Sequence, residues 1–231
     1  MPYLRGAHPS PRHRLAAATP HVATTPAPAQ FLWNPKQISM WGNATYGDCT
    51  VAEEAFAKSA TANVFIPDDT VIAWAQANGA IDGDTLIDVL DKMQTGGFAV
   101  NGQTYDDGPP VSVDWTQNDL LQNAISRGPV KIGVAADQLQ NAVPDPPTNG
   151  WIATGFTQDE NLDHCVSLCG YGSIEWLASQ LGVPFPTDTK ANPAYALFTW
   201  DSIGIIDVPS LLAITGEAWL RVPTTLTRAS T

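Results

Sequence analysis

The sequence predicts an α+β fold with a mainly helical first half and an antiparallel sheet in the second half. Segments before residue 100 contain good helix formers or apolar residues at helical spacing. From Gly128 onward the apolar segments are short and rich in β-branched and aromatic residues, as strands are. The 231 residues, 44% hydrophobic and only 15% charged, are typical of a compact globular protein. We therefore expect one domain built from two lobes.

The first 30 residues differ in composition from the rest of the chain. They are rich in Pro, Ala, Thr and His, and they are expected to form an extended or disordered arm. The folded domain is expected over residues 31–231. Its mainly helical lobe would cover about residues 31–110, and its sheet lobe about residues 111–231.

Three helices are expected in the first lobe, over residues 50–57, 70–75 and 86–93. Pro67-Asp68-Asp69 is expected to form the N-terminal cap of the second helix, which ends at Asn78-Gly79. The third places four apolar residues on one face and ends at Gly96-Gly97. Each of these helices therefore has a boundary or a face that can be read from the sequence.

The second lobe begins after Gly108-Pro109-Pro110, which breaks the chain. A short strand at 111–113 and a helix at 119–125 come first. Buried strands are expected over residues 129–135, 164–169, 195–200 and 218–222. The loops at 142–149 and 182–192 would wall a cleft.

One histidine and one cysteine stand out as candidate catalytic residues. His164 is the only histidine outside the first 21 residues, so a base working near neutral pH should be His164. Cys49 directly precedes the first expected helix, whose N-terminal N–H groups and dipole stabilise a thiolate. The two residues form a plausible acyl-transfer pair. The alternative is that Cys49 is a small buried apolar residue.

The other two cysteines are expected to belong to the core. Three cysteines do not make a disulfide framework, and Cys165 and Cys169 are too few for a structural zinc site. On a strand, both would lie on the face opposite His164. A disulfide between either of them and Cys49 would inactivate the proposed nucleophile.

Charge and hydropathy exclude some classes of partner. All 23 acidic residues follow Lys36, whereas four of the 11 basic residues lie at or before it, so the remainder is strongly acidic. Such a surface repels phosphate backbones and argues against nucleic acid as a partner. No run approaches the 18 apolar residues of a membrane helix, and no secretory signal is recognised. We expect no membrane partner, and a protein that is cytoplasmic or exported without a standard signal peptide.

Four landmarks in chain order resemble the papain-like cysteine peptidases. They are the Asn43 to Cys49 spacing of six residues, Gly128-Pro129-Val130, the run 163–172 with its Asp163-His164, and the closing run 216–221. The resemblance implies a papain-like fold with two lobes and an active-site cleft between them. It also implies a nucleophile at Cys49, a base at His164 and, where the family has Gln, an oxyanion donor at Asn43.

The third catalytic residue departs from the family pattern. The family places Asn-Ser-Trp-Gly after the third strand, and this chain has Phe198-Thr199-Trp200-Asp201. Matching the tryptophans puts Phe198 at the Asn position, where it cannot hold an imidazole by a hydrogen bond. Asp201 is the alternative, because a carboxylate could orient His164, although it could equally be an ordinary solvated turn residue. Asp48 is expected to cap the helix that follows it.

The first functional hypothesis is a thiol hydrolase that acts on a peptide or amide bond through a thioester. No metal or organic cofactor is implied, since the protein's own groups suffice for this chemistry. A second hypothesis keeps the fold without the activity and leaves a binding or structural protein. A third is a transglutaminase-like acyltransferase that passes the acyl group to an amine. Substrate specificity and oligomeric state are not predicted.

Overall fold

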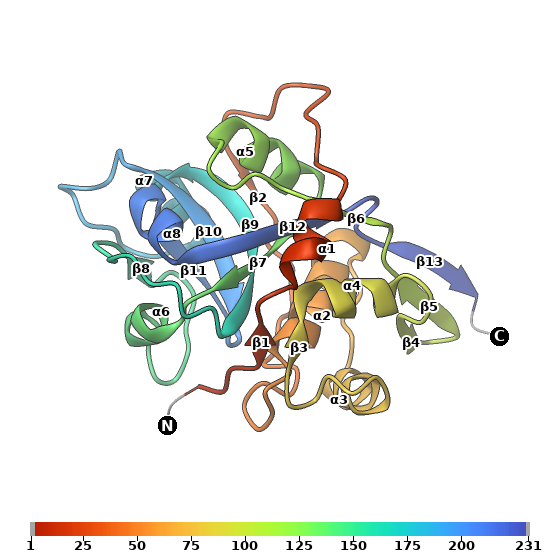
Figure 1. Ribbon diagram of the computed structural model, residues 1–231. Helices are drawn as coiled ribbons and strands as arrows, with labels where there is room; N and C mark the ends of the chain where they lie inside the picture. The colour runs from red at the N-terminus through yellow and green to blue at the C-terminus, as the bar shows by residue number, and fades with distance from the viewer. Residues whose placement is uncertain (1–2, 230–231) are drawn as a thin grey trace.

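An eight-stranded sheet organises the second half of the chain (Figure 1) in a computed structural model that describes residues 3–229. Its strand order is β6-β12-β7-β9-β10-β11-β8, and β2 pairs beside it with β9. All pairs are antiparallel except β8 with β11. The strands are β2 Phe31–Leu32, β6 Pro110–Ser112, β7 Val130–Val134, β8 Ile152–Ala153, β9 His164–Ser173, β10 Pro193–Thr199, β11 Ser202–Asp207 and β12 Thr215–Arg221. The four expected strands correspond to β7, β9, β10 and β12.

Four helices accompany this sheet: α5 Asn118–Arg127, α6 Asp137–Ala142, α7 Ile174–Leu181 and α8 Val208–Ile214. Only α5 was expected from the sequence. Side chains cap two of the others, because Ser173 accepts a hydrogen bond from the Trp176 N–H and Asp207 accepts one from the Ser210 N–H. Helix α7 ends at Gly182, whose φ of +70° favours glycine.

The first lobe contains the three expected helices and a small sheet at its edge (Figure 1). Its elements are α2 Cys49–Ala62, α3 Asp68–Ala77, α4 Leu86–Met93, β4 Phe98–Val100, β5 Gln103–Asp106 and, from the end of the chain, β13 Leu226–Ala229. Helix α4 buries the predicted apolar face, and Thr85 caps it by accepting from the Asp88 N–H at 3.2 Å. Within residues 3–229, no helix is both long enough and apolar enough to cross a bilayer.

The N-terminal arm is packed against both lobes, and it contains regular structure that was not expected. Strand β1, Ala7–His8, pairs in parallel with β3, Asp84–Thr85, and helix α1 covers Arg12–Ala17. Polar contacts hold the arm in place. The Ser10 N–H donates to Glu217 at 2.9 Å, and Arg14 pairs with Asp91 on α4. The expectation of an extended or disordered arm included neither helix α1 nor the pairing of the extended segment β1 with β3.

Apolar packing divides the interior into two large cores and a small third one. One large core lies between the sheet and helices α5, α6 and α8, and the other joins helices α2 to α4 with α7 and the opposite face of β9 to β11. The small core forms where β1 meets α2, α4 and β9, and its buried members are Ala7, Cys49, Leu86, Ile87, Leu90, Cys165 and Trp219. Cys49 therefore lies at the contact between the arm and both lobes.

A fully buried ionic network attaches helix α2 to the sheet. The Glu54 carboxylate receives hydrogen bonds from Lys131 Nζ on β7 at 2.5 Å and from Arg221 Nη2 on β12 at 2.5 Å. Lys58, one turn further along α2, pairs with Asp107. Burial raises the pKa of Glu54, but the charges of Arg221, Lys131 and Lys58 outweigh this effect and hold the pKa below its ordinary value.

Replacing Glu54 by Gln should destabilise the protein by about 3 kcal/mol or more, because Lys131 would remain buried without its counter-charge and Arg221 would keep only Asp107, whose Oδ2 lies 3.5 Å from its Nε. Chemical denaturation of the full-length protein measures the change. Glu160→Gln, at an exposed position, is the matched control and should change stability by less than about 0.5 kcal/mol. Equal effects of the two substitutions would contradict a structural role for the network.

Candidate active site

Cys49 is the first residue of α2, as expected, and it is 1% exposed. The backbone N–H groups of Cys165 and Gly6 approach its sulfur. Because the nitrogen of Cys165 is bonded to the carbonyl carbon of His164, the thiol lies beside the backbone of His164. Burial raises the pKa of Cys49 to about 12, although the two N–H groups act in the opposite direction. The thiol is therefore protonated in this structure.

His164 is the first residue of β9 and is also 1% exposed. Its Nε2 lies 2.7 Å from Thr199 Oγ1, and the indole of Trp200 stacks on the imidazole with 4.2 Å between ring centroids. Its Nδ1 has no hydrogen-bond partner among residues 3–229, so no bond joins it to Cys49. Burial, followed by the charge of Arg5, lowers the pKa of His164 to about 3. The ring is neutral.

Thr199, rather than Asp201, is the hydrogen-bond partner of the imidazole. The chain alternates along β10, so Phe198 faces the helical core, where it stacks on Phe56 at 4.3 Å, and Thr199 faces His164. Trp200 and Asp201 then take φ values of +42° and +58° in the turn to β11. Asp201 is exposed in that turn. Within residues 3–229 no hydrogen bond joins Asp201 to His164, and its exposed turn position matches the alternative of an ordinary solvated turn residue.

Asn43 is buried near the start of α2 and faces a carbonyl group of the N-terminal arm. Its Nδ2 donates to the Tyr46 carbonyl at 3.0 Å and to the Leu4 carbonyl at 3.3 Å. The amide side chain is thus held by its own loop and directed at a carbonyl oxygen. That is the type of contact required of an oxyanion donor.

Residues 3–8, which we call the N-terminal segment, cover these groups. The ring of Tyr3 stacks on Trp200 at 4.8 Å, and the Leu4 carbonyl accepts from Trp200 Nε1 at 3.1 Å. Further along, the Ala7 N–H donates to the Asp163 carbonyl at 3.2 Å, and the Gly6 carbonyl accepts from the Asp84 N–H at 3.0 Å. The segment therefore binds through its backbone, as an added strand does.

The segment fits closely because glycines line its path. A Cβ at Gly6 would lie 1.7 Å from the Gly47 carbonyl oxygen, and one at Gly83 would lie 2.3 Å from the Gly6 carbonyl oxygen. Any larger residue at position 6 would push the segment away. Sequence analysis missed this contact, and the only signal for it was an isolated glycine in an arm otherwise rich in proline and alanine.

Asp48 does not cap α2, contrary to expectation. Its side chain accepts no hydrogen bond from the helix N–H groups, and both carboxylate oxygens are buried without a partner in the described part of the chain. Burial, with a smaller contribution from the charge of Asp68, raises the pKa of Asp48 to about 8. The carboxyl group is therefore largely protonated at neutral pH.

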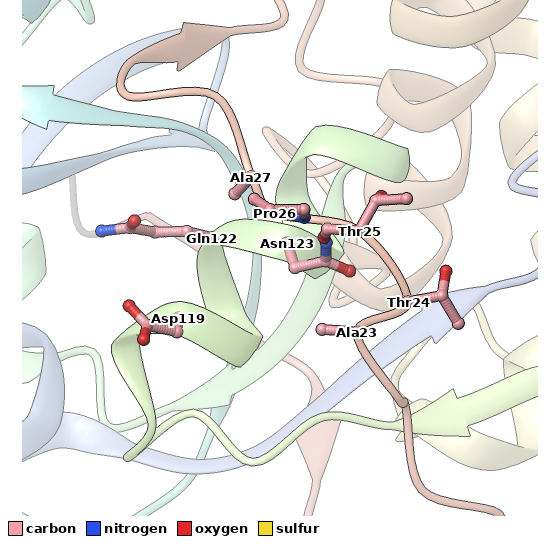
Figure 2. A pocket seen from close by; sticks show the side chains of 8 residues that line it. All are labelled: Ala23, Thr24, Thr25, Pro26, Ala27, Asp119, Gln122 and Asn123. Carbon is pink, nitrogen blue, oxygen red and sulfur yellow. The ribbon is translucent and has the colours of Figure 1, made fainter.

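A pocket with a volume of about 430 Å³ lies on another part of the surface (Figure 2). It is lined by residues 23–27 of the arm and by Asp119, Gln122 and Asn123 of α5. Asn123 anchors the arm there by donating to the Thr25 carbonyl at 2.6 Å. The lining includes neither Cys49 nor His164, so this hollow is separate from the candidate active site. Within residues 3–229, no group of three or more His, Cys, Asp or Glu side chains could hold a metal ion.

Comparison with solved structures identifies the class of fold. The chain is similar to the proform of Amb a 11, a ragweed pollen cysteine protease, with a TM-score of 0.63 and 11% identity over 91% of this chain and 72% of that one. It is also similar to xylellain, a cysteine protease from Xylella fastidiosa, with a TM-score of 0.62 and 11% identity over 95% and 96% of the two chains. No family model and no curated protein sequence matches.

A third similar structure is digestive procathepsin L 3 of Tenebrio molitor, with a TM-score of 0.60 and 14% identity over 88% of this chain and 73% of that one. The chain therefore has the papain-like fold, and the predicted α+β class with a helical part and antiparallel sheets is confirmed. At these identities the comparison establishes the fold alone.

Replacing Asp48 by Asn should stabilise the protein more at pH 8 than at pH 4. The folded-state pKa of about 8 lies above the ordinary 3.8, so the folded protein binds more protons than the unfolded chain between these values and loses stability as pH rises. Asn cannot ionise, so the variant should gain at least about 1 kcal/mol over wild type at pH 8 and little at pH 4.

Urea denaturation at both pH values measures this difference. The contribution of His164 is present in both proteins and cancels. Asp188→Asn, at an exposed loop position, is the matched control and should change stability by less than about 0.5 kcal/mol. A constant difference between wild type and Asp48→Asn across the range would contradict the raised pKa.

Proposed function

We propose that the protein is a thiol hydrolase of peptide or amide bonds, with Cys49 as nucleophile and His164 as general base and acid. The observation that carries the proposal is the grouping of four elements at one point. These are a thiol at the start of α2, an imidazole held by Thr199, the Trp200 ring over that imidazole, and the Asn43 amide directed at a carbonyl oxygen. The papain-like fold supports this assignment.

The chemistry uses the protein's own groups. His164 takes the proton of Cys49, and the sulfur forms a bond to the carbonyl carbon of the substrate. The Asn43 amide and the Cys49 N–H stabilise the negative charge on the carbonyl oxygen. The C–N bond then breaks, and the amine leaves with the proton from His164. Water, deprotonated by His164, attacks the thioester, which releases the acid and restores the thiol.

This reaction requires the N-terminal segment to move. In the structure described, the Gly6 N–H approaches the thiol, and the Leu4 carbonyl accepts a hydrogen bond from the Asn43 amide. Burial keeps both Cys49 and His164 neutral. Displacing the segment would admit water, which removes the dominant cause of both pKa shifts. It would also free the Cys49 sulfur to approach the unpartnered Nδ1 of His164. The chain as described is thus the closed form of the proposed enzyme.

Gly6→Val should open the site and produce hydrolytic activity in the full-length protein, because a Cβ at this position collides with the Gly47 carbonyl. The measurement is cleavage of an unfolded protein substrate, followed by mass spectrometry of the new termini. Adding Cys49→Ser or His164→Ala to the variant should abolish cleavage. Gly96→Val is the matched control, since the nearest atom to a Cβ there is 3.9 Å away, and it should stay as closed as wild type.

Two outcomes would favour other functions. If Gly6→Val exposes Cys49 to iodoacetamide and yet cleaves nothing, the fold is a binding protein without peptidase activity. If an added primary amine becomes joined to the substrate in preference to water, the enzyme is an acyltransferase. Both outcomes contradict the hydrolase assignment.

Thr199 is a positioning residue in this proposal, because it contacts His164 and not the substrate. In the Gly6→Val background, Thr199→Val should lower kcat by about tenfold with little change in KM, since it removes one hydrogen bond to the imidazole. Thr199→Ser keeps the hydroxyl and should retain most of the activity. Equal losses in both variants would indicate a packing effect instead. Asp201→Ala should leave kcat unchanged.

A further inference from the structure

The side chain of Arg5 occupies an acidic recess beside the candidate catalytic residues. Its Nη1 lies 2.5 Å from Asp137 Oδ1 and 2.7 Å from Asp163 Oδ2, and its Nη2 lies 2.6 Å from Gln140 Oε1. Only 20% of the Arg5 side chain remains exposed. Two nitrogens of one guanidinium therefore contact three oxygen acceptors, which uses the fixed fork of that group.

The recess is held in place by the fold as well as by Arg5. The second carboxylate oxygen of Asp163 accepts from the Ala136 N–H at 3.1 Å, and the Asp163 N–H donates to the Val134 carbonyl at 3.1 Å. Gln140 belongs to helix α6, where its N–H donates to the Ala136 carbonyl at 2.8 Å. These contacts fix Asp163 and the backbone of Gln140 independently of the arginine.

The recess also belongs to the cleft that the N-terminal segment fills. Asp163 directly precedes His164, and the same Asp163 accepts the Ala7 N–H at its carbonyl. The carbonyl of Leu4, the residue before Arg5, accepts a hydrogen bond from the Asn43 amide. The Asn43 amide thus binds the Leu4 carbonyl, and the acidic side chains bind Arg5, the next residue along the chain.

We propose that the recess formed by Asp137, Gln140 and Asp163 is a substrate subsite that selects an arginine side chain in a peptide. This inference rests on the proposed function, since a peptide substrate must replace the N-terminal segment. The occupant is a peptide because the Asp84 N–H and the Asp163 carbonyl pair with the two polar groups of the Gly6–Ala7 peptide bond. The acidic surface of the protein, with a net charge of −12, also attracts basic peptides.

The geometry discriminates against other side chains. A lysine ammonium is a point charge and cannot reproduce three contacts spread over two nitrogens. A citrulline has the shape of arginine but no charge, so both carboxylates would lose their counter-ion when it replaced arginine. The expected order of affinity is arginine, then lysine, then citrulline.

The first experiment measures the rate at which iodoacetamide alkylates Cys49 in full-length protein, by mass spectrometry of the Cys49 peptide. Arg5→Ala should increase this rate by about tenfold or more, because charge-assisted hydrogen bonds that hold the segment over the thiol are lost. Arg5→Lys should give an intermediate rate. Arg12→Ala removes the same charge from an exposed position of the arm and should change the rate less than about twofold.

The second experiment tests the recess with a peptide in trans. In the Arg5→Ala protein, a hexapeptide with the sequence of residues 3–8 should slow alkylation of Cys49, and the same peptide with citrulline in place of arginine should not. Adding Asp137→Asn, an exposed position outside the proposed catalytic group, should weaken protection by the arginine peptide. Equal protection by both peptides would overturn the subsite.

Alkylation does not depend on turnover, so this result is independent of the hydrolase assignment. Protection that requires arginine, together with an absence of cleavage in the Gly6→Val protein, would retain the subsite and reject the hydrolase. Cleavage in the Gly6→Val protein, together with equal protection by the two peptides, would retain the hydrolase and reject the subsite.

Discussion

The buried contact between Glu54 and its two cations determines where the candidate nucleophile lies. Glu54 belongs to the helix that begins at Cys49, Lys131 belongs to β7, and β7 pairs with β9, whose first residue is His164. A helix packed only by apolar contacts could slide along the sheet at modest cost. Two hydrogen-bonded ion pairs in a medium of low dielectric constant permit little such displacement. The network therefore fixes the geometry in which a thiol from one lobe meets an imidazole from the other.

The same burial keeps the proposed catalytic groups uncharged in the form described. Desolvation disfavours the thiolate at Cys49 and the imidazolium at His164, and the nearby Arg5 adds a further penalty for a second positive charge. Removing the N-terminal segment would reverse these effects together, because it exposes the pair and withdraws Arg5 at once. In the proposed mechanism, one movement of the chain would change solvent access, the charge of both groups and the availability of the Asn43 amide.

Local patterns in the sequence predicted the helices and strands that have strong periodicity or clear boundaries. The face of α4 and the helix start at Cys49 are examples. Helices α7 and α8 were not predicted, although side chains of Ser173 and Asp207 cap them. Spacing and chain order also indicated Cys49, His164 and Asn43 as candidates, and their catalytic roles stay a prediction.

The remaining features of the site depend on three-dimensional contacts. His164 contacts Thr199, although Asp201 was the expected partner. Thr199 is the residue of β10 that faces His164, and Asp201 lies in the next turn, where the φ values are positive. The pairing of Lys131 with Glu54 could not be read from the strand pattern, because the two residues lie 77 positions apart in the sequence. The N-terminal segment has no hydrophobic pattern that would predict its position. Backbone pairing and the close approach of Gly6 to Gly47 determine where it lies.

The N-terminal segment is joined to the rest of the arm by only three residues between β1 and α1. Its contact with the groups around Cys49 and His164 is therefore intramolecular, with an effective concentration that depends on the length and stiffness of the link. Dilution of the protein cannot release it, and a free peptide must compete with that local concentration. Breaking a single peptide bond in this link would turn the same contacts into a weak bimolecular interaction. The covalent link of three residues therefore keeps the molecule closed more effectively than any single contact does.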